Sequence, residues 1–260
     1  MNLLEKIKNK SKNTIKSLLS HEMVLVNKKV IIKYNYLLKK NYTVEIIKKI
    51  NDIDIIYEDN NIIVVNKPSG LLSISTEKET EKTLYKYISD YVKKSNKNAK
   101  IFVVHRLDKD TSGIVIFSKN QDFKNKLQQN WNDEVIRNYY AVVEGILEKK
   151  SGTIKSYLKE NSFHKTYSSN KGELAITNYE VIKTNDLYSL LKVNIKTGKK
   201  NQIRVHLSDI NHPIVDDKKY GSKIRAKRLM LCAYNVEFKN NSKYKFEIPY
   251  PEEFKKYIKA

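Results

Sequence analysis

From about residue 52 onward, apolar residues gather in short runs of strand length, with only a few helix-length patterns between them. Many of these runs alternate with polar residues or are bounded by turn residues, as strands of a sheet are. The expected strands cover residues 55–57, 62–65, 135–143, 187–195 and 229–238, and the expected helices cover 84–92, 123–131 and 203–210. Because strands outnumber helices and do not alternate with them strictly, the pattern predicts an α+β domain with a mixed, mainly antiparallel sheet and flanking helices.

The first fifty residues have a different pattern, which predicts a smaller structure. Leu and Ile at helical spacing predict one short helix at 3–7 and a second at 15–19, which Ser11 can cap. A strand, a turn and another strand are expected over 24–30, and a further short strand over 44–47. Lysines are dense throughout this segment.

The length of 260 residues allows one full-sized core and a small accessory domain. The change of pattern predicts a small α/β domain at 1–50 and a main domain at 51–260. No apolar run approaches the ~20 residues needed to cross a bilayer, and the N-terminus lacks the apolar segment of a secretory signal. We therefore expect a cytoplasmic protein without a membrane partner, acting as a monomer.

A metal site is not expected either. Cys232 is the only cysteine, so it has neither a disulfide partner within the chain nor companions for a zinc site. His206 and His212 lack a third ligand at metal spacing.

The net charge of +21 favours a polyanionic partner, which could be RNA, DNA or an anionic membrane surface. The alternative is a solvated surface in a chain whose composition is simply rich in lysine. Five of the 50 basic residues are arginine. In a chain that uses lysine by default, a retained arginine suggests a need for its planar, bidentate geometry.

The segment 101–117 holds a polar loop between two short apolar strands, which is where catalytic groups usually lie. The loop contains two carboxylates, Asp108 and Asp110, followed by hydroxyls and backbone donors at 111–113 that could hold a carboxylate in its ionised form. The alternative is an ordinary turn in which one of the aspartates caps the backbone. The residues by themselves leave both interpretations open.

Residues 105–113, HRLDKDTSG, resemble the H-R-L-D-x-x-T-S-G signature of RluA-type pseudouridine synthases. Five other segments resemble motifs of the same family and follow in the family's order. They are 65–71 (VNKPSGL), 137–145 (RNYYAVVEG), 197–206 (TGKKNQIRVH), 213–221 (PIVDDKKYG) and 228–233 (RLMLCA). The resemblance spans roughly residues 55 to 255 and implies the pseudouridine synthase fold.

The resemblance also implies roles for three residues. Asp108 would be the catalytic carboxylate, which either attacks the anomeric carbon of the ribose or takes a proton from the ribose. Tyr139 would stack on the uracil and help to remove the proton from carbon five. Arg204 would pair with Asp108 and keep it ionised. The chemistry conserves mass and redox state, so no cofactor is expected.

The remaining implied residues would contact RNA and help to flip the target base out of its stack. Arg106 would expel the base or fill the gap that it leaves. The others in this group are His105, Thr111, Lys67 and Lys199.

The chain departs from the family pattern at four positions, which puts substrate choice in more doubt than catalysis. They are Lys199 in place of arginine, Asn201 in place of histidine, Asp216 in place of glycine and Cys232 in place of histidine.

Residues 11–27 resemble the alpha-L RNA-binding domain named after ribosomal small-subunit protein four, although Glu22 and Lys28 stand where glycine is usual. The alternative is a basic extension without a fold of its own. The function expected from these resemblances is isomerisation of uridines in structured RNA. Large-subunit ribosomal RNA is expected first and transfer RNA second. A catalytically silent ribosome-assembly factor and a hydrolase of free nucleosides are the rival hypotheses.

Overall fold

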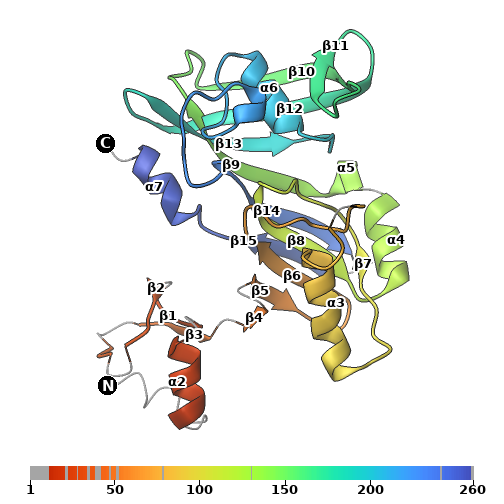
Figure 1. Ribbon diagram of the computed structural model, residues 1–260, viewed down its shortest axis with the longest axis vertical. Coiled ribbons are helices and arrows are strands. Elements are labelled where there is room, and N and C mark those ends of the chain that lie inside the picture. Colours follow the sequence, from red (N-terminus) through yellow and green to blue (C-terminus); the bar gives the residue numbers. More distant parts are fainter. Residues whose placement is uncertain are drawn as a thin grey trace. The chain divides into compact units, whose positions relative to one another are not determined.

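The computed structural model describes residues 12–20, 23–27, 29–33, 36–38, 42–46, 48–50, 53–77, 79–129, 131–240 and 242–258. The chain divides into two compact units, 1–56 and 57–260. Each unit is described by itself, and Figure 1 gives the labels of their helices and strands.

The N-terminal unit packs a helix on a small antiparallel sheet of order β2-β1-β3. Its elements are α2 (Lys12–Ser20), β1 (Val24–Val26), β2 (Lys29–Val30), β3 (Val44–Ile46) and β4 (Lys48–Ile50), with β5 (Ile53–Glu58) crossing into the second unit. Ile15 and Leu19 of the helix are buried with Val24, Val26 and Leu38. The predicted second helix and the predicted strands are confirmed. The predicted helix at 3–7 and the cap at Ser11 lie outside the described residues.

The C-terminal unit is built on one large sheet, in which the strands run in the order β11-β10-β12-β13-β9-β14-β8-β6. Their bounds are β6 (Ile62–Lys67), β8 (Ser112–Ser118), β9 (Ile136–Glu144), β10 (Ser151–Glu160), β11 (Thr166–Ser169), β12 (Glu173–Thr184), β13 (Tyr188–Ile195) and β14 (Leu231–Asn240). Neighbours in this order are antiparallel, except that β14 pairs parallel with β8. β7 (Phe102–Val103) adds to β8, and β15 (Ser242–Glu247) adds to β14. The predicted mixed, mainly antiparallel sheet is confirmed.

Helices flank this sheet, as predicted. They are α3 (Leu84–Ser95), α4 (Gln121–Gln129), α5 (Trp131–Glu134), α6 (Gln202–Asp209) and α7 (Glu252–Ile258). The single helix expected over 123–131 is two helices instead. α6 contacts β10, β11 and β12 (Figure 1), and buries Val205 against Leu158 and Ala175.

β6 and β8 form the most deeply buried part of the unit. Every residue of β8 is buried, and so are Ile62 to Val65 of β6. A tight turn precedes β6, in which the Asp59 carboxylate accepts hydrogen bonds from the backbone N–H groups of Asn61 and Ile62, both at 2.7 Å. This turn joins the strands that were expected at 55–57 and 62–65.

Candidate active site

The loop that carries Asp108 runs into β8, whose first residues are fixed against β14. Gly113 has a positive φ of 116°, and a Cβ at this position would lie 2.2 Å from the backbone oxygen of Ala233. Only glycine fits so close an approach between two backbones. The C-terminal end of the Asp108 loop is therefore held by the packed centre of the sheet.

A second segment, residues 67–73, holds the same loop from the other side. The fully buried ammonium of Lys67 donates hydrogen bonds to the carbonyl oxygens of Pro68, Leu71 and Lys109, at 2.8–3.0 Å. The Ser73 hydroxyl donates to the Leu107 carbonyl oxygen and accepts from the Leu107 N–H. Both chain neighbours of Asp108 are thus tied in place.

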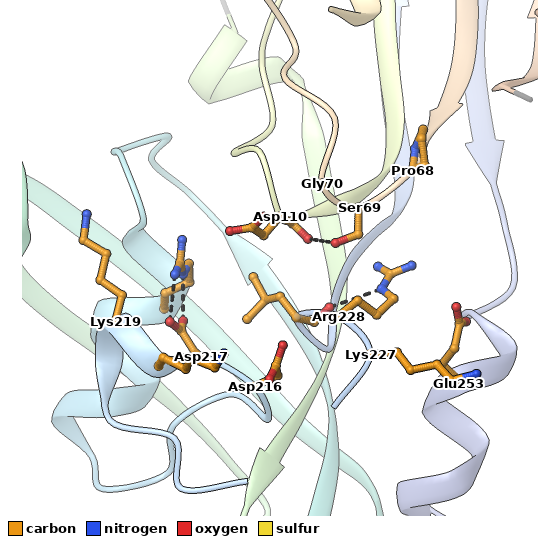
Figure 2. A pocket seen from close by; sticks show the side chains of 13 residues that line it. Pro68, Ser69, Gly70, Asp110, Asp216, Asp217, Lys219, Lys227, Arg228 and Glu253 are labelled. Atoms are coloured by element: carbon orange, nitrogen blue, oxygen red, sulfur yellow. Dashed lines mark hydrogen bonds and ion pairs between the residues drawn. The ribbon is translucent and has the colours of Figure 1, made fainter. Parts of the chain in front are cut away.

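Two further hydrogen bonds complete this attachment. Gly70 N–H donates to the Lys109 carbonyl oxygen, and the Ser69 hydroxyl donates to the Asp110 carbonyl oxygen, as Figure 2 shows. Burial lowers the pKa of Lys67 to about 7, against the opposing effect of Asp110 and Asp108. The Lys67 ammonium is enclosed and bonded to three carbonyls, so in this geometry it holds the loop, and its expected contact with RNA stays a prediction.

Asp108 lines a cavity of about 640 Å³ together with Arg106, Tyr139 and Arg204. Its carboxylate makes no hydrogen bond or ion pair with any residue that the structure describes. Burial raises the pKa of Asp108 above the ordinary 3.8, and this effect exceeds the opposing ones of Arg204, Lys67 and Lys200. The site therefore offers a half-buried carboxylate acceptor on a loop that is hydrogen-bonded in place on either side of Asp108.

Arg204 is held by Asp217, which corrects the expected ion pair with Asp108. Its Nε and Nη2 donate to the two carboxylate oxygens of Asp217, both at 2.7 Å, and its Nη1 donates to Asn201 Oδ1 at 3.1 Å. Asp217 is fully buried, so this bidentate pair fixes the guanidinium on α6. The charge of Arg204 still favours the ionised form of Asp108, but through space rather than through a hydrogen bond.

Tyr139 lies on β9, between β13 and β14, and its ring lines the same cavity. Burial raises the pKa of Tyr139 to about 12. The hydroxyl therefore stays protonated at neutral pH, where it can donate a hydrogen bond. The structure thus brings Asp108, Tyr139 and Arg204 to one cavity, as the sequence predicts.

The other predicted RNA-contacting residues divide into two groups. Arg106 is exposed at the cavity and has no hydrogen bond or ion pair among the described residues, which suits a cation that meets a ligand. Lys199 and Thr111 also line this cavity, but the Lys199 ammonium pairs with Glu173 at 2.6 Å and Thr111 is buried. Thr111 and Ser112 supply no hydroxyl to the Asp108 carboxylate in the described structure.

His105 lines the same cavity and also has structural contacts, so its expected contact with RNA stays a prediction. Its Nε2 accepts a hydrogen bond from the Ile116 N–H at 3.1 Å, and its ring stacks on Trp131 with the centroids 4.8 Å apart. Burial lowers the pKa of His105 to about 3, so the imidazole is neutral. It therefore fastens the start of the loop to β8.

Asp217 and Trp131 are the residues of this site that sequence reasoning missed. Asp217 stands in the segment PIVDD, where an adjacent pair of carboxylates in a family motif was the available signal. Nothing in the sequence marks Trp131 beyond its position in an expected helix.

Comparison with known proteins decides the family. The sequence model of the RNA pseudouridylate synthase family matches residues 61–209. The chain is 32% identical to an uncharacterized RNA pseudouridine synthase, YhcT, of Bacillus subtilis, over 81% of this chain and 74% of that protein. It is 36% identical to ribosomal large subunit pseudouridine synthase D of Borreliella burgdorferi, over 78% of this chain and 66% of that protein.

The chain belongs to the RNA pseudouridylate synthase family. It is therefore an enzyme, an isomerase that acts on RNA. The fold agrees, since the chain resembles the solved structure of human RNA pseudouridylate synthase domain containing 4. The TM-score is 0.66 at 21% identity, and the match covers 77% of this chain and 89% of that one.

In this pseudouridine synthase, each departure from the family pattern has a defined place. Asn201 accepts the third hydrogen bond of Arg204, and Asp216 has a positive φ of 67° where the family has glycine. Asp216 compensates by accepting a hydrogen bond from the Ala226 N–H at 3.1 Å. Burial raises the pKa of the Cys232 thiol to about 11, so this cysteine is an inert packing residue.

Neither a membrane helix nor a metal cluster is evident in the described part of the chain. No helix there is long and apolar enough to cross a bilayer. No group of three or more histidine, cysteine, aspartate or glutamate side chains is arranged there to hold a metal ion.

Proposed function

We propose that this enzyme isomerises specific uridines in large-subunit ribosomal RNA, with Asp108 as its catalytic carboxylate and without a cofactor. The observation that carries the proposal is the Asp108 carboxylate itself. It lines a cavity beside Tyr139 and Arg204, and no described residue occupies its oxygens. A carboxylate held on a rigid loop and left unbonded suits a group that must reach a substrate.

The reaction balances without any added reagent. The bond between N1 of uracil and C1′ of ribose breaks, and a bond between C5 and C1′ forms. The proton lost from C5 is matched by one gained at N1. Asp108, in its ionised form, would either attack C1′ or take a proton from the ribose.

Tyr139 and Arg204 would support this reaction from fixed positions. The Tyr139 ring offers a face on which uracil can stack, and its high pKa favours a neutral hydroxyl that donates a hydrogen bond over a phenolate base. The charge of Arg204 would keep Asp108 ionised when substrate excludes water from the cavity. Arg106, exposed beside both, would fill the space that the flipped uridine leaves.

The N-terminal unit is proposed as an alpha-L type RNA-binding domain, with the domains divided at about residue 50. Its helix, its small antiparallel sheet and the dense lysines of this segment support that assignment. Lys–phosphate contacts would make RNA affinity fall as salt rises. Ribosomal RNA is preferred to transfer RNA because the relative from Borreliella burgdorferi is a ribosomal large subunit synthase. The expected location is the cytoplasm.

Tritium release from RNA labelled at carbon five of uracil tests the proposal. The substrate is unmodified large-subunit ribosomal RNA, and wild type is compared with Asp108→Asn. We expect Asp108→Asn to lower the rate roughly a thousandfold or more, because its amide can neither attack nor accept the proton. Asp110→Asn is the matched control, since this neighbouring carboxylate is exposed and lies outside the Asp108 cavity.

Equal rates for wild type and Asp108→Asn would overturn the role of Asp108. If wild type released no tritium but bound the RNA, ribosomal RNA would be the wrong substrate or the protein a catalytically silent assembly factor. Labelled transfer RNA would then separate these two explanations.

A further inference from the structure

The hairpin between β10 and β11 has a rigid tip, because one side chain closes it. Asn161 Oδ1 accepts hydrogen bonds from the backbone N–H groups of Phe163 and Lys165, at 3.0 and 2.9 Å. The Asn161 N–H donates to the Lys165 carbonyl oxygen at 3.0 Å. His164 takes a left-handed φ of 56° to complete the turn. The direction of the side chains on this tip is thus set by the backbone.

Phe163 stands on this tip with 86% of its surface exposed. Single exposed apolar residues are ordinary on protein surfaces and need no partner. What distinguishes Phe163 is that an aromatic ring is presented by a closed turn, among cations. The cations nearest to it in the chain are Lys159 and Lys165, and both are exposed.

Several contacts connect the tip to the Asp108 cavity. The Lys219 ammonium donates to the His164 carbonyl oxygen at 2.9 Å, and Glu160 accepts from both His164 and Lys200. Lys200 lines the cavity that contains Asp108. The ion pair between Glu160 and Lys200 therefore connects the tip to that cavity.

Tyr220 makes a second connection. The Lys165 ammonium lies 5.6 Å from the centre of the Tyr220 ring, and the Arg204 guanidinium lies 5.0 Å from it. Lys219 also lies on the second cavity, of about 780 Å³, whose far side carries Lys227 and Arg228 (Figure 2). Arg204 lines both cavities, and the second one carries cations together with carboxylates such as Asp110, Asp216 and Glu253.

We propose that Phe163 stacks on an unpaired base of the RNA substrate, close to the uridine that enters the Asp108 cavity. The surrounding cations would hold the phosphates on either side of that base. Aromatic rings stack on any base, and cations beside them hold the backbone, so this arrangement fits single-stranded RNA. The charge of the tip favours RNA over an apolar protein surface. The inference rests on the proposed function and adds a binding site for a neighbouring nucleotide.

Substitutions at Phe163 in the full chain test the stacking. The substrate is in-vitro-transcribed large-subunit ribosomal RNA, labelled with tritium at carbon five of uracil. We expect Phe163→Ala to lower kcat/KM about tenfold, mainly through a higher KM, as alanine substitution of a base-stacking ring does. Phe163→Trp should stay within about twofold of wild type, whereas Phe163→Leu should behave like Phe163→Ala, because leucine has no ring face.

Leu187→Ala is the matched control. Leu187 is 65% exposed and lies in the turn between β12 and β13. The register of β10 and β12 puts that turn at the opposite end of these strands. Its removal should change neither kcat nor KM. Because the Phe163 side chain is exposed, its variants should also keep the thermal midpoint of the wild type.

Wild-type kinetics for Phe163→Ala would overturn the proposal, as would equal activity of Phe163→Leu and Phe163→Trp. If wild type released no tritium from this RNA, the proposed substrate would fail, and filter binding of the same RNA would decide the inference alone. Weaker binding by Phe163→Ala than by Leu187→Ala supports the contact. Equal binding by these two variants refutes it and leaves a protein or lipid partner for the tip.

Discussion

The centre of the sheet and its outer ribbon are built differently. β8 has all seven residues buried, and it leads directly from the Asp108 loop. β10, in the ribbon formed with β11 and β12, has a single buried residue, Leu158, and exposed side chains at most other positions. The difference indicates a division of labour. The packed centre holds the loop that carries Asp108, whereas the ribbon leaves polar and cationic side chains exposed.

Two glycines make the sharpest test of this comparison. A Cβ at Gly113 in the centre would lie 2.2 Å from the Ala233 backbone oxygen, and one at Gly172 in the ribbon would lie 2.3 Å from the Leu158 backbone oxygen. We expect Gly113→Ala to destabilise the fold by about 4 kcal/mol, because packed strands cannot move apart. Gly172→Ala should lower stability by only about 2 kcal/mol, since an exposed ribbon can shift.

Urea unfolding would measure both values, and tritium release would show whether Gly113→Ala abolishes catalysis. Similar losses of stability in the two variants would mean that the ribbon is as rigid as the centre.

Ion pairs give a smaller contrast of the same kind. Asp217→Asn removes the charge from the buried pair with Arg204, and we expect a loss of about 3 kcal/mol because an uncompensated guanidinium stays buried. Glu173→Gln breaks the exposed pair with Lys199 and should change stability by less than about 0.5 kcal/mol. Thermal unfolding of the two variants compares them. A loss of catalysis in Asp217→Asn alone would tie the placement of Arg204 to the reaction.

The smallest expected effect concerns the positive charge of Lys200 and its influence on the pKa of Asp108. Lys200 lowers the pKa of Asp108 through space, while burial raises it. In the proposed reaction the ionised carboxylate is the active form, so activity should be lost as pH falls through this pKa. Lys200→Gln removes a lowering effect and should move the acid limb of the rate profile to higher pH, by a few tenths of a unit.

Lys155→Gln is the control for this shift, because Lys155 is exposed on β10 and is not among the groups that affect Asp108. An acid limb that moved to lower pH in Lys200→Gln would contradict the assignment of Asp108 as the titrating group.

The same contrast explains what could be predicted from the sequence. Apolar runs such as Ile62–Val65 and Ile114–Phe117 indicate buried strands, and for this reason the centre of the sheet could be predicted. β10, β11, β12 and β15 were missed, because exposed strands carry few apolar side chains and hence little periodic signal.

The site followed a similar rule. The family motifs predicted that Asp108, Tyr139 and Arg204 would lie at one site. A sequence motif does not show, however, which side chains form ion pairs with each other. Asp217 lies thirteen residues beyond Arg204 and took the ion pair that was expected of Asp108. Lys67 is one polar residue among others in its motif, and only the fold shows that its side chain is enclosed.

The position of β14 has a consequence for the synthesis of this enzyme. β8, which follows the Asp108 loop, and β9, which carries Tyr139, are not neighbours, and β14 lies between them. β14 begins only at Leu231, so a chain emerging from the ribosome holds both halves of the site long before they can be joined. Nascent chains would therefore remain inactive until β14 has been translated and has paired with β8 and β9.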